Sequence, residues 1–275
     1  MKRLILLALM LFLSIKAATA QEVPNNCIPG VFSVSAEKKV YFSKGNLQYQ
    51  PSSNTWRFAE QQYTLLDDDE TYGHTTTSYT PTSEDWIDLF SWGMWLDEIT
   101  DKEMITNTSM IDSEYSPTLT DTIEFAKNHR TVDGEQWLTL SKDEWVYLFN
   151  TRTTTNDIRY SKATVHDVNG LVLLPDTWNG TYTFANNNTS DASFAEITND
   201  DWEILESEGV VFLPIAGCRL GMSIYTVGSY GIYWSSTAYS ETLAYYLGFD
   251  SGDVCPADYD GGRFMGLSVR LVRCL

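Results

Sequence analysis

The chain has 275 residues, of which 37 are acidic and 18 are basic, so its formal net charge at pH 7 is -19. A protein this acidic repels nucleic acid and anionic membrane surfaces, and we therefore expect no nucleic-acid partner. Beyond the first twenty residues no apolar run approaches the length of a transmembrane helix, which excludes a polytopic membrane protein.

Residues 1–20 have the three parts of a secretory signal peptide. Lys2 and Arg3 give a positive start, an apolar run too short to span a bilayer follows, and Ala18-Thr19-Ala20 forms a small-residue cleavage site. The alternative is an N-terminal membrane anchor, but the polar residues from Gln21 onward favour cleavage. The protein is therefore expected to be secreted or exposed at the cell surface, with no transmembrane segment after cleavage.

Four short segments in the N-terminal part alternate apolar and polar side chains, as half-buried antiparallel strands do. The predicted strands are 31–35, 40–43, 47–49 and 56–58. A run of four carboxylates at 67–70 follows and indicates a loop. We interpret residues 21–80 as a β-rich N-terminal segment that packs on a main domain formed by residues 81–275.

Three later segments share a helix-start signature, which is a hydroxyl N-cap, acidic residues in the first turn and then a tryptophan. The predicted helices are 83–90, 141–149 and 198–205, and a fourth is predicted at 121–128. Ser141 and Glu144 have the spacing of a capping box, and Gly209 is placed to end the third helix. The tryptophans of the three signatures are expected to be buried in the core: Trp86, Trp145 and Trp202.

Short strands are predicted between these helices, at 136–140, 171–174 and 210–213. In the last sixty residues, apolar segments alternate with connections rich in glycine, tyrosine and aspartate. This pattern is typical of a small sheet that displays long loops, and such loops are where binding surfaces lie. Together, the helices and short strands predict an α+β fold with one compact domain and an N-terminal β-rich extension.

Four motifs, in order along the C-terminal half of the chain, resemble the FISUMP-type major paralogous domains. They are Trp-Leu-Thr-Leu-Ser-x-x-Glu-Trp-x-x-Leu at 137–148, Leu-Pro-x-Ala-Gly at 213–217, Gly-x-Tyr-Trp-Ser-Ser-Thr at 231–237 and Gly-x-Ser-Val-Arg-x-Val at 266–272. The resemblance implies an exported bacterial domain with a C-type-lectin-like fold. Such a fold has short antiparallel strands, two or three short helices and long loops.

Two groups of proteins with that fold bear on function. In the variable receptor-binding proteins of diversity-generating retroelements, the varied stretch would correspond to about residues 233–263 here. This stretch is rich in tyrosine, which gives adaptable contact area at low entropic cost. The formylglycine-generating enzymes need a closely placed cysteine pair, which this chain lacks, so their activity is not expected. The predicted ligand-binding residues are Tyr239, Tyr245, Tyr246, Asp250, Asp253, Asp258, Tyr259, Asp260 and Arg263.

Four cysteines remain after cleavage, and an exported protein can form disulfides. Four cysteines allow three pairings, between which the sequence alone does not choose. We favour Cys27 with Cys274, which would tie the two ends of the chain, and Cys218 with Cys255, which would pin the C-terminal loops. Their spacings do not suit a zinc site.

The loop at 250–260 places four carboxylates within eleven residues, and calcium accepts such oxygen ligands in irregular loops. The calcium signatures of lectins are absent, so a solvated acidic loop is the leading interpretation. Calcium binding is the alternative, and no other cofactor is expected.

The leading functional prediction is a secreted or cell-surface binding or adhesion module for a protein or glycan ligand. No catalytic residue is predicted, because His74, His129 and His166 lie in no metal-binding spacing and beside no nucleophile motif. The alternatives are an extracellular enzyme acting on polysaccharide through paired carboxylates, and a structural component of a surface assembly. Arg270 lies inside a β-like run and is expected to cap carbonyls or to pair with an internal carboxylate.

Overall fold

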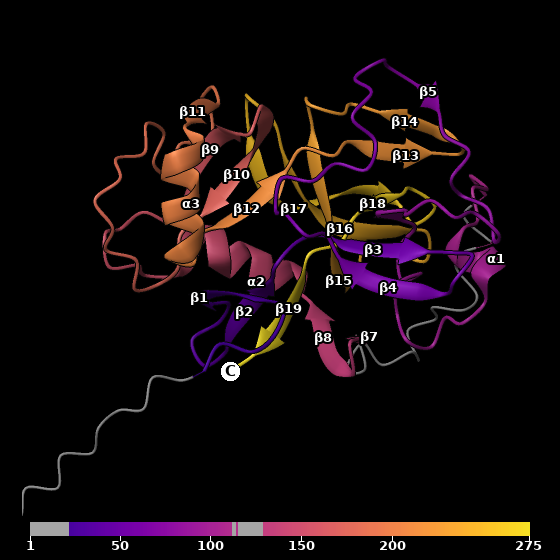
Figure 1. Cartoon of the computed structure of the whole chain (residues 1–275), viewed down its shortest axis with the longest axis horizontal. Helices are drawn as coiled ribbons and strands as arrows, with labels where there is room; N and C mark the ends of the chain where they lie inside the picture. The colour runs from indigo at the N-terminus through magenta and orange to yellow at the C-terminus, as the bar shows by residue number, and fades with distance from the viewer. Residues whose placement is uncertain (1–21, 112–113, 115–128) are drawn as a thin grey trace, which may run out of the picture.

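The computed structural model describes residues 22–111, 114 and 129–275, apart from the side chains of Tyr259 and Asp260. The predicted signal peptide and the predicted helix at 121–128 lie outside the described residues. Figure 1 shows the chain from its β-rich N-terminal part to the C-terminal strand, with the two ends of the described chain on the same side.

Among the described residues, strands account for 37% and helices for 10%. The strands are β1 (Cys27–Ser33), β2 (Lys39–Ser43), β3 (Leu47–Gln50), β4 (Thr55–Phe58), β5 (His74–Thr75), β6 (Leu89–Phe90), β7 (His129–Val132), β8 (Glu135–Thr139), β9 (Tyr160–Val165), β10 (Val168–Leu173), β11 (Ala195–Ile197), β12 (Val211–Pro214), β13 (Cys218–Leu220), β14 (Ser223–Tyr225), β15 (Gly231–Ala238), β16 (Leu243–Phe249), β17 (Val254–Gly262), β18 (Leu267–Ser268) and β19 (Leu271–Cys274). The helices are α1 (Lys102–Ile105), α2 (Lys142–Val146), its π-helical continuation η3 (Tyr147–Thr151), and α3 (Asn199–Ser207). The predicted α+β fold class is therefore wrong, because the protein has a β-rich fold built from several small sheets.

The predicted helix at 83–90 is the clearest local error. The Ser83 hydroxyl accepts a hydrogen bond from the backbone N–H of Asp85, as an N-cap would, but no helix follows. Instead Ile87 forms a bridge with Tyr49, and Leu89 pairs with Ser268 in the β6–β18 ladder. Pairing with distant strands outweighs the local helix signal here, since helix propensity is a weak preference that tertiary contacts override.

The predicted helices at 141–149 and 198–205 both form, the first as α2 with η3 and the second as α3. Ser141 and Glu144 form the predicted capping box at the start of α2. Thr198 caps α3 by accepting from the backbone N–H of Asp201, and Gly209 follows with a φ of +90°. Trp145 and Trp202 are buried as predicted, whereas Trp86 is only half-buried.

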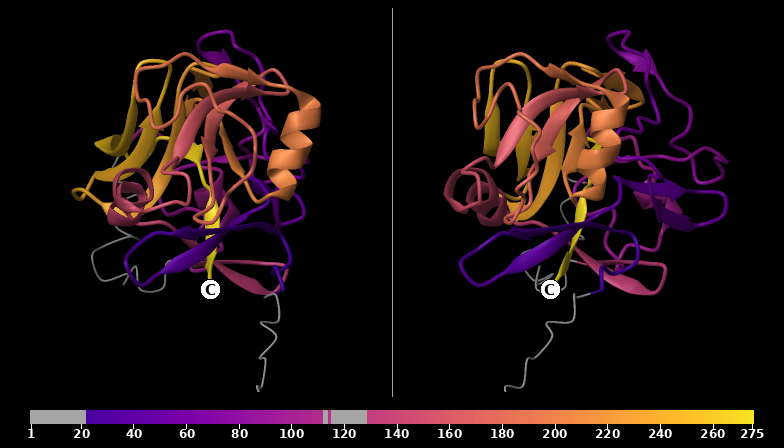
Figure 2. Two further views of the ribbon diagram at one scale, coloured as in Figure 1. Left: turned by 90° about the vertical axis from the view of Figure 1, so that its left-hand side faces the viewer. Right: turned by 60° about the vertical axis from the view of Figure 1, so that its left-hand side comes forward.

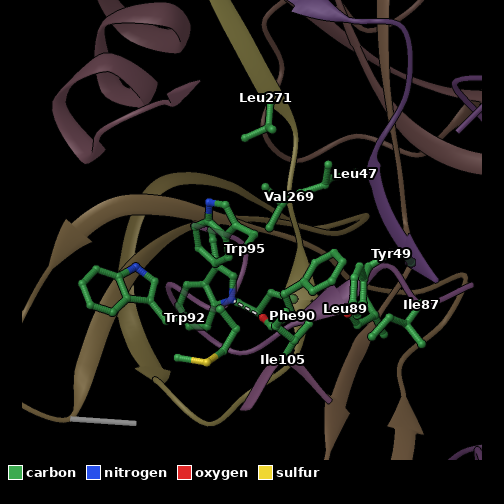
Figure 3. Close-up of a cluster of buried hydrophobic side chains, with 14 of the residues drawn as sticks. Leu47, Tyr49, Ile87, Leu89, Phe90, Trp92, Trp95, Ile105, Val269 and Leu271 are labelled. Carbon is green, nitrogen blue, oxygen red and sulfur yellow. Dashed lines mark hydrogen bonds between the residues drawn. The ribbon is translucent and has the colours of Figure 1, made fainter. Parts of the chain in front are cut away.

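A central sheet, in the order β17-β16-β15-β18-β6, has buried side chains on both faces. Along β15, Ile232 and Trp234 point into one core while Tyr233 points into the other. Figure 3 shows part of the first core, where Phe90, Trp92 and other large side chains pack closely. Because both faces are covered, only the ends and the β17 edge of this sheet can carry a binding surface.

The sheet β11-β9-β10-β12 is also buried on both faces. Leu171 and Leu173 join a core shared with the central sheet, whereas Val172 and Phe212 pack toward Trp202 of α3. Figures 1 and 2 show α3 lying along the outside of these strands. The predicted strands at 31–35, 40–43, 47–49, 56–58, 136–140, 171–174 and 210–213 all form, as β1, β2, β3, β4, β8, β10 and β12.

Neither predicted disulfide forms, and all four cysteines are free thiols. Cys27 and Cys274 lie on the two strands that flank β2, opposite Ser43 and Val40 respectively. That places them about 9.5 Å apart across the sheet and about 10 Å apart along it. A disulfide requires Cα atoms within about 7 Å. Cys218, on β13, and Cys255, on β17, form no disulfide with each other either.

Candidate ligand-binding surface

The hairpin of β15 and β16 ends in a four-residue loop, 239–242, which carries the first of the predicted binding residues. Leu243 O accepts hydrogen bonds from the backbone N–H of Tyr239 at 2.9 Å and of Ser240 at 3.1 Å. The Ser240 hydroxyl accepts from the backbone N–H of Thr242 and of Leu243. These local bonds fix the backbone of the loop, so its side chains are presented on a rigid frame.

Tyr239 and Tyr245, two of the predicted binding residues, come together beside this loop. Their ring centroids are 5.4 Å apart with an interplanar angle of 89°, the edge-to-face arrangement that aromatic quadrupoles favour. The Nζ of Lys142, from the start of α2, lies 5.0 Å from the centroid of the Tyr245 ring. Tyr239 is 48% exposed and Tyr245 is half-buried. We call Tyr239, Tyr245 and Lys142 the Tyr239 platform.

Arg263 supports this platform from inside the protein and is not a ligand-binding residue. Its side chain is buried, and its Nη2 donates to the carbonyl of Ser240 in the loop. Its backbone N–H donates to the carbonyl of Thr242 at 2.9 Å. The prediction that Arg263 contacts a ligand is therefore wrong, because its guanidinium is used to hold the loop.

Trp92 forms the floor below Arg263. The guanidinium lies 4.4 Å from the centroid of the Trp92 ring, and the indole Nε1 donates to Ser235 O at 2.9 Å. The Ser235 hydroxyl in turn donates to Tyr245 O at 2.8 Å. The backbone of Tyr245 is thus tied to the core through Ser235. The sequence analysis missed Lys142, Trp92 and Ser235, of which Ser235 lies within a motif used for the family resemblance.

Tyr246 does not belong to the surface, because consecutive residues in a strand face opposite sides of the sheet. Tyr246 is 6% exposed and makes an edge contact with Trp234 at 6.3 Å between ring centroids. Its hydroxyl also exchanges a hydrogen bond with Tyr230. The prediction that Tyr246 binds a ligand is wrong, and the residue is part of the core.

Asp250 and Asp253 form the turn between β16 and β17. The Oδ1 of Asp250 accepts from the backbone N–H of Gly252 at 2.6 Å and of Asp253 at 2.9 Å. The Oδ1 of Asp253 accepts from the Ser190 hydroxyl at 2.6 Å, and this bond joins the turn to another loop. That bond is the largest influence holding the pKa of Asp253 below its usual value. Both carboxylates therefore form hydrogen bonds that stabilise the turn, whereas the sequence analysis predicted that they contact a ligand.

The remaining predicted residues lie on the edge strand β17. Asp258 is half-buried and lies opposite Tyr246 on β16. The side chains of Tyr259 and Asp260 are not among those that the structure describes. Among the described residues no group of three or more histidine, cysteine, aspartate or glutamate side chains is arranged to hold a metal ion. The calcium prediction for this loop therefore gains no support from the described side chains.

Arg270 confirms the expectation that it caps a carbonyl. It is fully buried, its Nη2 donates to Gln62 Oε1 at 2.6 Å, and its Nη1 donates to Phe212 O at 3.4 Å. Burial lowers its pKa to about 10, against the opposing effect of Tyr233. Among the described residues no carboxylate forms an ion pair with it, so its hydrogen-bond partners are neutral groups, and its Nε has no partner.

Comparison with known proteins adds a family but no function. The family model of a domain of unknown function, DUF8237, matches residues 30–272. No curated protein and no solved structure matches the chain. The resemblance to FISUMP-type domains therefore stays a prediction. Among the described helices none has the length and apolar character needed to span a membrane. Since the matched region takes in nearly all of the described fold, the chain belongs to the DUF8237 family.

Proposed function

We propose that the protein is a secreted or cell-surface binding module that contacts a protein or glycan ligand through the Tyr239 platform. The observation that supports this most is the edge-to-face pair of Tyr239 and Tyr245, which is solvent-accessible on a loop braced by Arg263. The predicted signal peptide supports the location, because it would deliver this surface outside the cell.

The arrangement suits recognition because the two rings are already ordered. A tyrosine side chain has only two rotatable bonds, and a ring held by its neighbour loses little further freedom on binding. The rings supply apolar area and the hydroxyl groups supply hydrogen bonds. Lys142, whose Nζ also lies 3.1 Å from Asp143 Oδ1, adds a charged group, so the platform offers stacking, hydrogen-bonding and ionic contacts within a few ångströms.

The test is binding of the protein, purified after expression of the full chain, to glycan arrays and protein arrays, with and without chelator. The double variant Tyr239→Ala/Tyr245→Ala should lose the interactions of the original protein. Tyr72→Ala is the matched control, since Tyr72 is 78% exposed and lies on another loop. Equal binding by the double variant and the original protein would contradict the proposal, provided that both unfold at the same temperature.

Conservative variants separate the two contributions of the platform. Tyr239→Phe and Tyr245→Phe keep the rings and remove the hydroxyl groups. If stacking dominates, these variants should retain most of the affinity, whereas Lys142→Ala should weaken binding of acidic ligands alone.

A further inference from the structure

Two cavities lie next to α3, the helix that Figure 1 shows at its left, and they have one lining residue in common. Each has a volume of about 330 Å³, within the range of small-molecule sites. The first is lined by one face of α3 and by the loop at 181–183. The second is lined by the start of β1 and by the loop at 175–179. Glu208 lines both cavities and therefore lies between them.

The shared wall is built around a hydrogen bond from Trp178 to Glu208. The indole Nε1 of Trp178 donates to Oε2 of Glu208 at 2.8 Å, which holds the carboxylate in place. Gly180 leaves room for it, because a Cβ there would lie 2.4 Å from the same oxygen. A carboxylate accepts about four hydrogen bonds. Glu208 is an exposed residue, and no other described side chain or backbone N–H donates to its carboxylate, so acceptor capacity remains for a ligand.

The lining has a definite chemical character. It combines the ring of Tyr182, the amide of Asn179 and hydroxyl groups with two carboxylates, Asp201 and Glu208. Burial and the nearby Asp201 raise the pKa of Tyr182, so its hydroxyl remains a hydrogen-bond donor. No lysine, arginine or histidine is among the residues that line either cavity. An anionic ligand would be repelled by the carboxylates, whereas a neutral ligand rich in hydroxyl groups finds acceptors and an aromatic face.

We propose that this double cavity binds two adjacent units of an uncharged oligosaccharide, with one unit in each cavity and the Glu208 carboxylate accepting hydroxyl hydrogen bonds from both. Tyr182 contacts the apolar face of the unit in the first cavity, and Asn179 bonds hydroxyl groups in the second. The site is separate in sequence and in lining residues from the Tyr239 platform, and the proposal does not depend on that one.

The experiment is calorimetric titration of the full-length protein with a panel of neutral disaccharides and trisaccharides of glucose, galactose, mannose and N-acetylglucosamine. Matching oligosaccharides that contain uronic acid or sulfate form the second arm. At least one neutral compound should bind, and its charged counterpart should bind at least tenfold more weakly. Absence of binding by every neutral compound, or a preference for the acidic ones, would overturn the proposal.

Three variants assign the binding to this site. Glu208→Gln and Tyr182→Ala should each weaken the neutral ligand at least tenfold. Asp200→Asn is the matched control, because it removes one exposed carboxylate from the same helix without touching either cavity, and its affinity should stay within twofold. Unchanged affinity in Glu208→Gln and Tyr182→Ala, with normal thermal unfolding, would overturn the assignment. Loss of sugar binding in Tyr239→Ala/Tyr245→Ala alone would also overturn it and would support the Tyr239 platform instead.

Discussion

The guanidinium of Arg263 lies 4.4 Å from the centroid of the Trp92 ring, while the backbone N–H of Trp92 donates to Arg263 O at 2.8 Å. The two residues therefore hold each other through both side chain and backbone. Through Arg263 the pair reaches the loop at 239–242, and through the indole it reaches Ser235. This relationship explains why Arg263, although it lies within the Tyr/Asp-rich stretch, stabilises the loop from inside the protein.

Replacing Arg263 with alanine should destabilise the protein by about 2–4 kcal/mol, because it removes a buried cation–π contact and a charged hydrogen bond. Denaturant unfolding measures the loss. Arg57→Ala is the control, since Arg57 lies 3.7 Å from the centroid of the Trp86 ring in a more exposed setting and should cost only about 0.5–1 kcal/mol. Equal losses of unfolding free energy in the two variants would contradict the stabilising role of Arg263.

Because of Asp88, we expect the free energy of unfolding to fall as the pH rises from about 4 to about 7. Burial raises its pKa from 3.8 to about 7, against a hydrogen bond from the backbone N–H of Leu66. The unfolded chain loses this proton at lower pH than the folded protein, so rising pH favours unfolding within this window. Asp88→Asn should therefore gain stability relative to the original protein across these pH values. A difference between the two that does not change with pH would refute this assignment.

The four thiols should all react with an alkylating reagent when the protein is unfolded without reductant. Exposed Cys274 should react first in the folded state and buried Cys218 last. Burial raises the pKa of the Cys27 thiol to about 11, which keeps its reactive thiolate scarce. Intact-mass measurement counts the adducts. Fewer than four adducts on the unfolded protein would show that a disulfide had formed after all.

Gly30→Ala should destabilise the protein more than Gly134→Ala. A Cβ at Gly30 would lie 2.1 Å from the carbonyl oxygen of Gly209, so two backbone segments would have to separate, at roughly 3 kcal/mol. At Gly134 nothing lies within 4 Å, and the cost is confined to its φ of +79°, about 1–2 kcal/mol. Thermal unfolding compares the two, and a smaller loss for Gly30→Ala would mean that β1 and the end of α3 adjust freely.

The sequence predicted the elements whose signals are local. The capping box of Ser141 and Glu144, the Gly209 helix end and the alternating strands were correct because patterns of neighbouring residues indicate them. The fold class was wrong because short strands such as β6 form only by pairing with distant partners. No local pattern in residues 83–90 could reveal the partner strand β18, and the helix signature there was the stronger local signal.

The candidate site was predictable in position but not in detail. Tyr239 and Tyr245 meet as expected, yet Tyr246 and Arg263 point inward. Alternation along β16 puts Tyr245 and Tyr246 on opposite faces of the sheet, but the sequence does not say which of the two faces the core. The double cavity at Glu208 was missed entirely, because its walls come from loops and a helix end that no sequence pattern brings together with β1, near the start of the chain.

The sheet order β1-β2-β19-β8-β7 places the last strand between one of the first strands and one from the middle of the chain. During synthesis β2 therefore lacks one of its two neighbours until residue 274 has been made. Pairing over such a span is slow, because a very long loop must close before the contact forms. Partly made chains thus carry an incomplete sheet, which can close only after residues 271–274 have been synthesised.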